Sequence, residues 1–184
     1  MLYTRKGDDG TTKTFGCDQR ISKSSAIAEA LGSLDEANSF LGLCKIKSEK
    51  EKLLLPDNNS VAKTIHNVQK NLFIIQAEIA GSPMSIEENK IKEMEKIIDD
   101  IEKELPPIKS FFISGGAKLA AYFDIARTIL RRAERRVVEV SEEKKVKVSD
   151  FSSAYLNRLS SLLYALARFT NHKFGIKEES PDYE

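Results

Sequence analysis

The sequence predicts an all-α protein, a five-helix bundle in an up-and-down arrangement, preceded by an ordered N-terminal loop. Two observations carry this prediction. Apolar residues recur at helical spacing in five separate segments, and no convincing run of strands interrupts them. A length of 184 residues suits one domain with a substantial core. We therefore expect a single domain over 1–184, with 1–22 as the loop and 176–184 as a tail.

The first two helices are expected over residues 24–47 and 61–80. Gly81 and Pro83 supply the stop of the second. The polar stretch 48–60 between them is interpreted as a connection. The apolar positions that define the two helices are Ile27, Leu31, Leu34, Ala37 and Leu41, and then Ile65, Val68, Leu72, Ile75 and Ile79.

The third helix is expected to begin with a capping box, with Ser85 as N-cap and Glu88 three residues later, and to end before Pro106. The fourth is expected from about Gly116 to 140. A charged turn at 142–147 then leads to the fifth, over 149–173. The early residues are rich in Gly, Thr, Asp and Lys, which favours an ordered loop or a short extended segment.

Composition excludes several classes of protein. Lys plus Arg number 29 and Asp plus Glu 28, so a net charge of +1 argues against bulk electrostatic binding of nucleic acid or membrane. Cys17 and Cys44 form neither a disulfide framework nor a CxxC metal pair, and two histidines are too few for most transition-metal sites. With no apolar stretch near 18 residues and no secretory leader, a cytoplasmic, reducing setting is expected.

The fourth helix carries the most informative polar residues. Arg127, Arg131 and Glu134 fall within an arc of about 60°, Arg135 lies at its margin, and Arg132 points away with Arg136. Five arginines in ten residues are compatible with a solvated face that contains Glu134–Arg pairs. They are also compatible with a cradle for a polyphosphate, because guanidinium groups at i and i+4 repel unless an anion lies between them.

The fifth helix carries a polar stripe beside its leucine face. The stripe suits a pocket wall or a subunit contact, but it also fits an ordinary solvent face, above all for Arg168 and Asn171, and Asn157 could simply support the helix start. Its members are Asn157, Ser161, Tyr164, Arg168 and Asn171.

Two glycine-containing segments could bind anions. Residues 4–12 offer flexible amides, hydroxyls and cations, although they are not a Walker A loop and such clusters are mostly turns. Ser114, Gly115 and Gly116 precede the arginine-rich helix and form either an anion site or a simple N-cap.

Three more residues stand out. Asp35 lies next to the apolar stripe of the first helix and calls for a partner, for which Arg127 is a candidate within the chain or across a subunit boundary. Phe111 and Phe112 would ordinarily belong to the core.

The motifs TRKGDDGTT, RISK, ALGSLDEANSFLG, FFISGG, ARTILRRAER and YLNRLSSLLYALAR follow one another in this order. Together they resemble the PduO-type ATP:cob(I)alamin adenosyltransferases, over residues 3–174. The resemblance implies a ferritin-like five-helix bundle that forms a homotrimer with sites between adjacent subunits. It also implies transfer of the 5′-deoxyadenosyl group of ATP to cobalt, with Mg²⁺, giving adenosylcobalamin and triphosphate. A corrinoid reductase and an adenosylcobalamin-dependent client enzyme are the further partners it suggests.

The resemblance also assigns roles to individual residues. The N-terminal loop would wrap the nucleotide through Thr4, Arg5, Lys6, Gly7 and Thr12. Lys23 would meet the phosphates, and ATP with its Mg²⁺-linked triphosphate would be held by Arg131, Glu134, Arg135 and Asn157. Asp35 and Arg127 would form a salt bridge between subunits. Phe111 would crowd the lower face of the corrin and favour loss of the lower axial ligand.

Three positions depart from the family pattern. Ser114 replaces a usual proline, Asp124 a common histidine and Ser161 a frequent aspartate. These departures affect the corrinoid pocket more than the type of reaction.

Three other functions remain alternatives on the residues alone. A di-iron carboxylate bundle would need paired ExxH motifs, and neither His66 nor His172 has Glu three residues before it. A helical adaptor or nucleic-acid binder could use the arginine face but would not need the glycine segments. A corrinoid carrier or sensor on the same scaffold is the third alternative.

Overall fold

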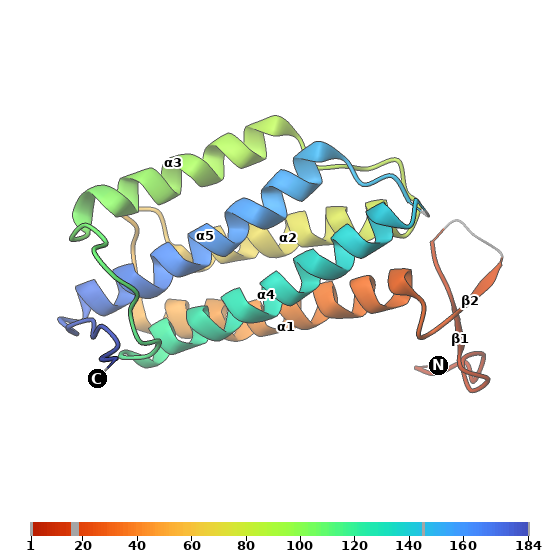
Figure 1. Cartoon of the computed structure of the whole chain (residues 1–184), viewed down its shortest axis with the longest axis horizontal. Coiled ribbons are helices and arrows are strands. Elements are labelled where there is room, and N and C mark those ends of the chain that lie inside the picture. Colours follow the sequence, from red (N-terminus) through yellow and green to blue (C-terminus); the bar gives the residue numbers. More distant parts are fainter. Residues whose placement is uncertain (1, 16–18, 145, 184) are drawn as a thin grey trace.

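The computed structural model describes residues 2–15, 19–144 and 146–183. In this part of the chain five helices run along one long axis and alternate in direction, so the predicted all-α bundle is confirmed (Figure 1). Two short strands lie at one end of the bundle, and the C terminus lies at the other. The elements are β1 (Thr11–Lys13), β2 (Arg20–Ser22), α1 (Ala26–Glu51), α2 (Val61–Ile79), α3 (Glu88–Glu104), α4 (Lys118–Glu142) and α5 (Asp150–Lys173).

The N-terminal segment contains a small antiparallel hairpin. β1 pairs with β2 in a register that places Thr12 opposite Ile21. The expected short extended segment is therefore confirmed, with a second strand that pairs with the first. Cys17 lies outside the described residues. Cys44 belongs to the core of α1, where burial raises the pKa of its thiol to about 12 and keeps the thiol protonated.

The core forms where α4 packs between α1 and α5, with α2 against α1 and α3 against α5. Residues of the predicted apolar stripes, such as Leu34, Leu72 and Phe123, are fully buried. Each such side chain contributes about 1.5–3 kcal/mol when it leaves water. No helix among the described residues is long and apolar enough to span a bilayer.

The first connection begins later than expected. α1 continues to Glu51 and ends at Lys52, whose left-handed conformation closes the helix. Ser48, expected to open the connection, is buried and donates its hydroxyl to the carbonyl oxygen of Cys44 at 2.7 Å. Because this hydroxyl is satisfied by its own helix, a serine here does not end the helix.

The predicted capping box of α3 is wrong. α3 begins at Glu88 after Glu87, and Ser85 lies outside the helix. Ile86 explains the difference: its side chain is buried and its N–H donates to the Ser152 hydroxyl of α5 at 3.4 Å. Packing against α5 holds this residue outside the helix, so α3 cannot begin earlier.

Two helix starts are capped by side chains from distant elements. α4 begins at Lys118, close to the expected start near Gly116, and the N–H of its N-cap residue Ala117 donates to Asn171 Oδ1 of α5 at 2.9 Å. The N–H of Ser149, the N-cap of α5, donates to the buried carboxylate of Glu78 in α2 at 2.7 Å. Side chains from α5 and α2 therefore satisfy the backbone donors at these two N-caps.

Candidate functional site

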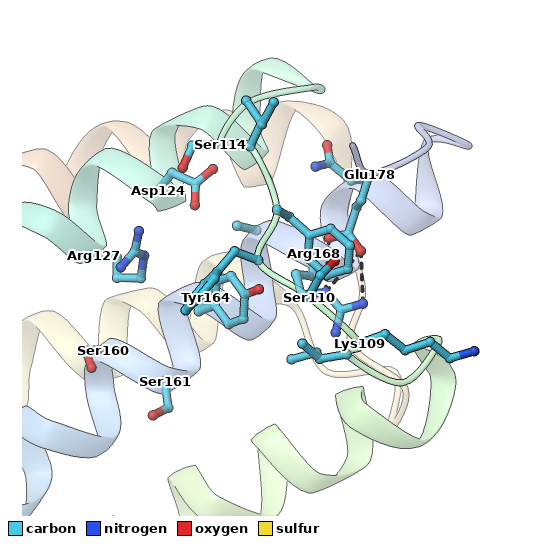
Figure 2. Close-up of a pocket in the computed structure, with 16 residues that line it drawn as sticks. Lys109, Ser110, Ser114, Asp124, Arg127, Ser160, Ser161, Tyr164, Arg168 and Glu178 are labelled. Carbon is cyan, nitrogen blue, oxygen red and sulfur yellow. Dashed lines mark hydrogen bonds and ion pairs between the residues drawn. The ribbon is translucent and has the colours of Figure 1, made fainter. Parts of the chain in front are cut away.

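A cavity of about 640 Å³ opens at the end of the bundle opposite the hairpin (Figure 2). Its walls come from α4, from α5, from the segment 108–114 that precedes α4, and from Glu178 in the tail. Ser114, Asp124 and Ser161, the three departures from the family pattern, all line this one cavity. A volume of this size accommodates part of a large organic ligand.

Four of the five residues of the polar stripe of α5 form one wall, which confirms the pocket-wall interpretation for these four but not for Asn157. Ser161, Tyr164, Arg168 and Asn171 all line the cavity. The alternative of a solvent face is wrong for Arg168 and Asn171, because both are buried.

Asn171 fixes the glycine turn before α4. Its Nδ2 donates to the carbonyl oxygen of Gly115 at 2.9 Å, while its Oδ1 accepts from Ala117. Gly116 has a φ of 94°, and a Cβ there would come within 2.5 Å of Asn171 Oδ1. This position therefore requires glycine for both its backbone conformation and its space. The glycine turn is capped by α5 and not by Ser114, so the simple N-cap interpretation is wrong.

Arg168 holds the tail and the segment before α4 together. It is only 5% exposed, and its Nε and Nη2 donate to the carboxylate of Glu178 at 2.9–3.1 Å. Nη2 also donates to the carbonyl oxygen of Pro106 at 3.0 Å, and the guanidinium lies over the ring of Phe112. Sequence reasoning missed Glu178 because a glutamate in a polar terminal tail carries no periodic signal.

Phe111 lies at the rim of the cavity. It is 82% exposed, whereas its neighbour Phe112 is partly buried against Arg168. The expectation that both rings belong to the core is wrong for Phe111. The segment that carries it is fixed by the tail, since the N–H of Ile113 donates to the carbonyl oxygen of Glu179 at 2.8 Å. An exposed aromatic ring held at a cavity mouth is suited to contact a ligand.

Asp124, Arg127 and Tyr164 form the polar inner part of the cavity (Figure 2). Burial raises the pKa of the Asp124 carboxyl above its ordinary value, although the N–H of Gly115 donates to it at 3.2 Å and Arg127 lies nearby. Burial also raises the pKa of Tyr164. The guanidinium of Arg127 lies 5.9 Å from the centre of the Tyr164 ring.

Further along α4, Arg131, Glu134 and Arg135 lie on the side of the helix that faces solvent, and we call them the arginine stripe. Arg131 and Arg135 are exposed, and Nη1 of Arg135 donates to the carbonyl oxygen of Arg131 at 3.0 Å. Glu134 accepts from Asn157 Nδ2 of α5 at 3.2 Å, and no ion pair joins it to an arginine among the described residues. Asn157 thus contacts the stripe in the third turn of α5 and does not support the helix start. The predicted Glu134–Arg pairs are wrong, so the cations of this stripe remain exposed.

The proposed pair of Asp35 and Arg127 does not form within the chain. Asp35 is exposed, and its neighbour Glu36 pairs with Arg132 of α4. Arg127 is partly buried, and its Nε has no hydrogen-bond partner among the described residues. The pair within one chain is therefore excluded. A pair between Asp35 and Arg127 of another subunit stays a prediction.

The N-terminal segment presents its predicted ligand-binding residues at the surface. Thr4, Arg5 and Lys6 are exposed, whereas Gly7 and Thr12 are partly buried. Lys23 Nζ donates to the carbonyl oxygen of Gly7 at 2.7 Å, which ties the loop to the residue after β2.

Arg20, which sequence reasoning missed, organises this loop. Its guanidinium donates to the carbonyl oxygens of Lys6 and Thr11, and it lies 3.5 Å from the carboxylate of Asp9. The sequence signal for this residue was its place in the RISK motif, directly before the isoleucine.

The loop and the arginine stripe do not meet in this chain. No hydrogen bond joins Thr4, Arg5, Lys6 or Lys23 to Arg131, Glu134 or Arg135, all of which are described. The structure therefore brings together the cavity residues, and separately the loop residues and the stripe. A ligand that touched the loop and the stripe together would need either movement of the loop or a second copy of the chain.

These features define a helical-bundle protein with a ligand cavity at one end and exposed arginines further along the same helix. Comparison with known proteins gives the family. The sequence matches the family model described as cobalamin adenosyltransferase over residues 2–170, and the chain belongs to this family.

Known relatives and structures agree with this family. Corrinoid adenosyltransferase PduO from Citrobacter freundii is 38% identical over 178 residues, which cover 93% of this chain but 50% of that protein, so the chain spans about half of its length. Corrinoid adenosyltransferase from Bacillus subtilis (strain 168) is 35% identical over 179 residues, covering 95% of this chain and 89% of that protein. A variant of a PduO-type ATP:corrinoid adenosyltransferase from Lactobacillus reuteri, in complex with cobalamin and ATP, superposes with a TM-score of 0.87 at 26% identity, over 100% of this chain and 97% of that one.

Proposed function

We propose that this protein transfers the 5′-deoxyadenosyl group of ATP to the cobalt of cob(I)alamin, forming adenosylcobalamin and inorganic triphosphate. The observation that carries the proposal is the arrangement of α4, which contributes to an aromatic-rimmed cavity and then exposes an arginine stripe. A large apolar ring with polar edges fits the cavity, and a triphosphate fits the stripe. The family relatives support the same pair of substrates.

In this reaction the electron pair of Co(I) forms the bond to C5′ of ATP, and the bond between C5′ and oxygen breaks. Its electrons leave with triphosphate, so no protein nucleophile is required. The protein has to orient C5′ toward cobalt and stabilise the departing charge. Arg131, Arg135 and Lys23 are exposed, which supports a role for them and for the N-terminal loop in binding that charge.

Magnesium fits this arrangement as an ion that arrives with the nucleotide. Among the described residues no group of three or more His, Cys, Asp or Glu side chains is placed to bind a metal. Mg²⁺ commonly takes one or two protein carboxylates together with substrate phosphates and water, and Glu134 supplies such a carboxylate within the stripe. When bound, Mg²⁺ would add charge stabilisation for the triphosphate.

We assign Phe111 to the lower face of the corrin. Its exposed ring at the cavity rim would exclude water or a base from the lower axial position of cobalt. A cobalt without a lower ligand is easier to reduce from Co(II) to Co(I). A reductase would supply that electron, and a client enzyme would consume the adenosylcobalamin.

A homotrimer accounts for the separation of the loop from the stripe. In such an assembly the loop of one subunit would reach the arginine stripe of its neighbour, and Asp35 would pair with the neighbour's Arg127. The exposure of Asp35 and of Thr4, Arg5 and Lys6 in the single chain supports this arrangement.

The test is an anaerobic assay with ATP, Mg²⁺ and reduced cob(I)alamin, which follows a light-sensitive cobalt–carbon product and released triphosphate. Arg131→Ala should lower kcat/KM for ATP about a hundredfold, because it removes contacts to the developing charge. Arg132→Ala is the matched control, since Arg132 pairs with Glu36 and should leave ATP use near wild type. Equal rates for both variants would refute the cradle, and absence of product from wild type would refute the reaction.

A further inference from the structure

Asp124 is a carboxylate in the cavity wall that has only one backbone hydrogen bond. Its Oδ2 accepts from the N–H of Gly115 at 3.2 Å, and Figure 2 shows the carboxylate directed toward the interior of the cavity. No lysine or arginine among the described residues forms an ion pair with it. The nearby charge of Arg127 offsets part of the desolvation cost of this half-buried carboxylate, and a bound hydrogen-bond donor would offset more of it.

Arg127, one turn further along α4, supplies the complementary group. It lines the same cavity, and its Nε is buried without a hydrogen-bond partner. Two other charged residues of the lining, Arg168 and Glu178, pair with each other, and Lys109 lies on the segment before α4. The cavity therefore presents an acceptor, the Asp124 carboxylate, together with a donor, the guanidinium of Arg127.

A primary carboxamide matches this pair of groups. Its N–H donates to a carboxylate and its carbonyl oxygen accepts from a guanidinium. A ligand carboxylate would be repelled by Asp124, and a ligand ammonium would be repelled by Arg127. A corrin ring carries uncharged primary carboxamides on side chains around its rim, so the proposed substrate brings such groups to the cavity.

We propose that Asp124 determines corrinoid specificity by accepting a hydrogen bond from one peripheral carboxamide of the corrin, whose carbonyl oxygen accepts from the guanidinium of Arg127. This inference rests on the proposed function. It predicts that the protein discriminates against a corrinoid in which that one amide has been hydrolysed to a carboxylate.

The test measures the dissociation constants of cobalamin and of its separated monocarboxylic acids by isothermal calorimetry. For wild type, one acid isomer should bind at least about tenfold more weakly than cobalamin, because a carboxylate would face Asp124. Asp124→Asn keeps an acceptor for Gly115 and removes the charge. In this variant cobalamin should bind about threefold more weakly, and the discrimination against that isomer should fall to about threefold or less.

Lys63→Ala, on the exposed surface of α2 and outside the cavity lining, should keep the wild-type discrimination. Equal binding of every isomer to wild type would overturn the inference, and so would undiminished discrimination in Asp124→Asn. If wild type still adenosylated cobalamin, the proposed function would not be affected by either result. Failure of wild type to bind cobalamin at all would overturn both.

Discussion

The two segments that flank the helical bundle are organised in different ways. The C-terminal tail is held by contacts within its own chain: the buried guanidinium of Arg168 donates to Glu178, and the backbone carbonyl oxygen of Glu179 accepts from Ile113 in the segment before α4. The N-terminal loop is organised only locally, by Arg20 and Lys23, and keeps Arg5 and Lys6 at the surface. This difference indicates that the tail is part of the fold. The exposed side chains of the loop, in contrast, are accessible to a ligand or a second subunit.

The largest effect is expected for the tail. Glu178→Ala would leave the buried Arg168 with the Pro106 carbonyl oxygen as its remaining hydrogen-bond acceptor, which should lower the free energy of unfolding by about 3 kcal/mol. In a chain of this size that corresponds to a fall in Tm of roughly 6–12 °C, measurable by circular dichroism. Glu179→Ala is the control, because Glu179 binds Ile113 through its backbone and should change stability by less than about 0.5 kcal/mol. Equal melting of the two variants would show that the tail is not held by its ion pair.

The opposite pattern is expected for the loop. Lys23→Ala removes an exposed cation assigned to the phosphates, so kcat/KM for ATP should fall about thirtyfold, equivalent to about 2 kcal/mol. Tm should change by less than about 2 °C, because the residue is exposed. Lys63→Ala, on the exposed surface of α2, is the control for loss of one positive charge. If Lys23→Ala lowered Tm but left kcat/KM for ATP unchanged, the loop would serve stability like the tail, and the contrast between the two segments would be wrong.

Phe111→Ala tests the role of the aromatic ring on the segment before α4, which the tail holds in place. Adenosylation that starts from cob(II)alamin with a reductant should slow about tenfold, since the lower face of cobalt would be open to a ligand. The KM for ATP and the Tm should remain near wild type because the ring is exposed. The same variant assayed with preformed cob(I)alamin is the internal control and should lose less activity. Equal losses of activity in the two assays would show that Phe111 does not act in the reduction of Co(II) to Co(I).

The smallest effect is expected at the subunit boundary. Asp35→Asn should raise the dissociation constant of the proposed homotrimer about threefold to tenfold, as expected for one interfacial ion pair. Glu36→Gln, one residue away, removes a pair that lies within the chain and should not change assembly. Analytical ultracentrifugation of both variants over a dilution series measures the difference. Identical dissociation would exclude Asp35 from the interface.

Helical periodicity was sufficient to predict the bundle, because amphipathic helices reveal their buried faces locally. It predicted the buried stripes of α1, α2 and α4 and the pocket wall on α5. It placed α2 and α5 to within one residue, but it failed at the start of α3, where the outcome depends on a distant partner: Ser85 satisfies the local capping pattern, yet packing of Ile86 against α5 delays the helix. Such long-range competition leaves no trace within one short segment.

The candidate site was predicted in part for the same reason. The arginine stripe follows from helical geometry, and the family resemblance supplied Phe111 and the loop residues. The burial of Arg168 could not be predicted, because an arginine on a polar stripe looks like a solvent residue until its partner Glu178 folds back on it. The assignment of Asp35 to another subunit also depends on contacts that one chain does not contain.

The caps supplied to α4 and α5 by distant side chains have a consequence for the order of folding. Asn171 follows Ala117 by 54 residues, and Glu78 precedes Ser149 by 71, so neither helix start is complete until its partner helix has docked. Amide hydrogens at helix starts commonly exchange quickly with solvent, because they fray. Here the amide hydrogens of Ala117 and Ser149 should exchange as slowly as those of the core, through global unfolding alone. These loop-closing contacts make formation of the two ends a late and cooperative event.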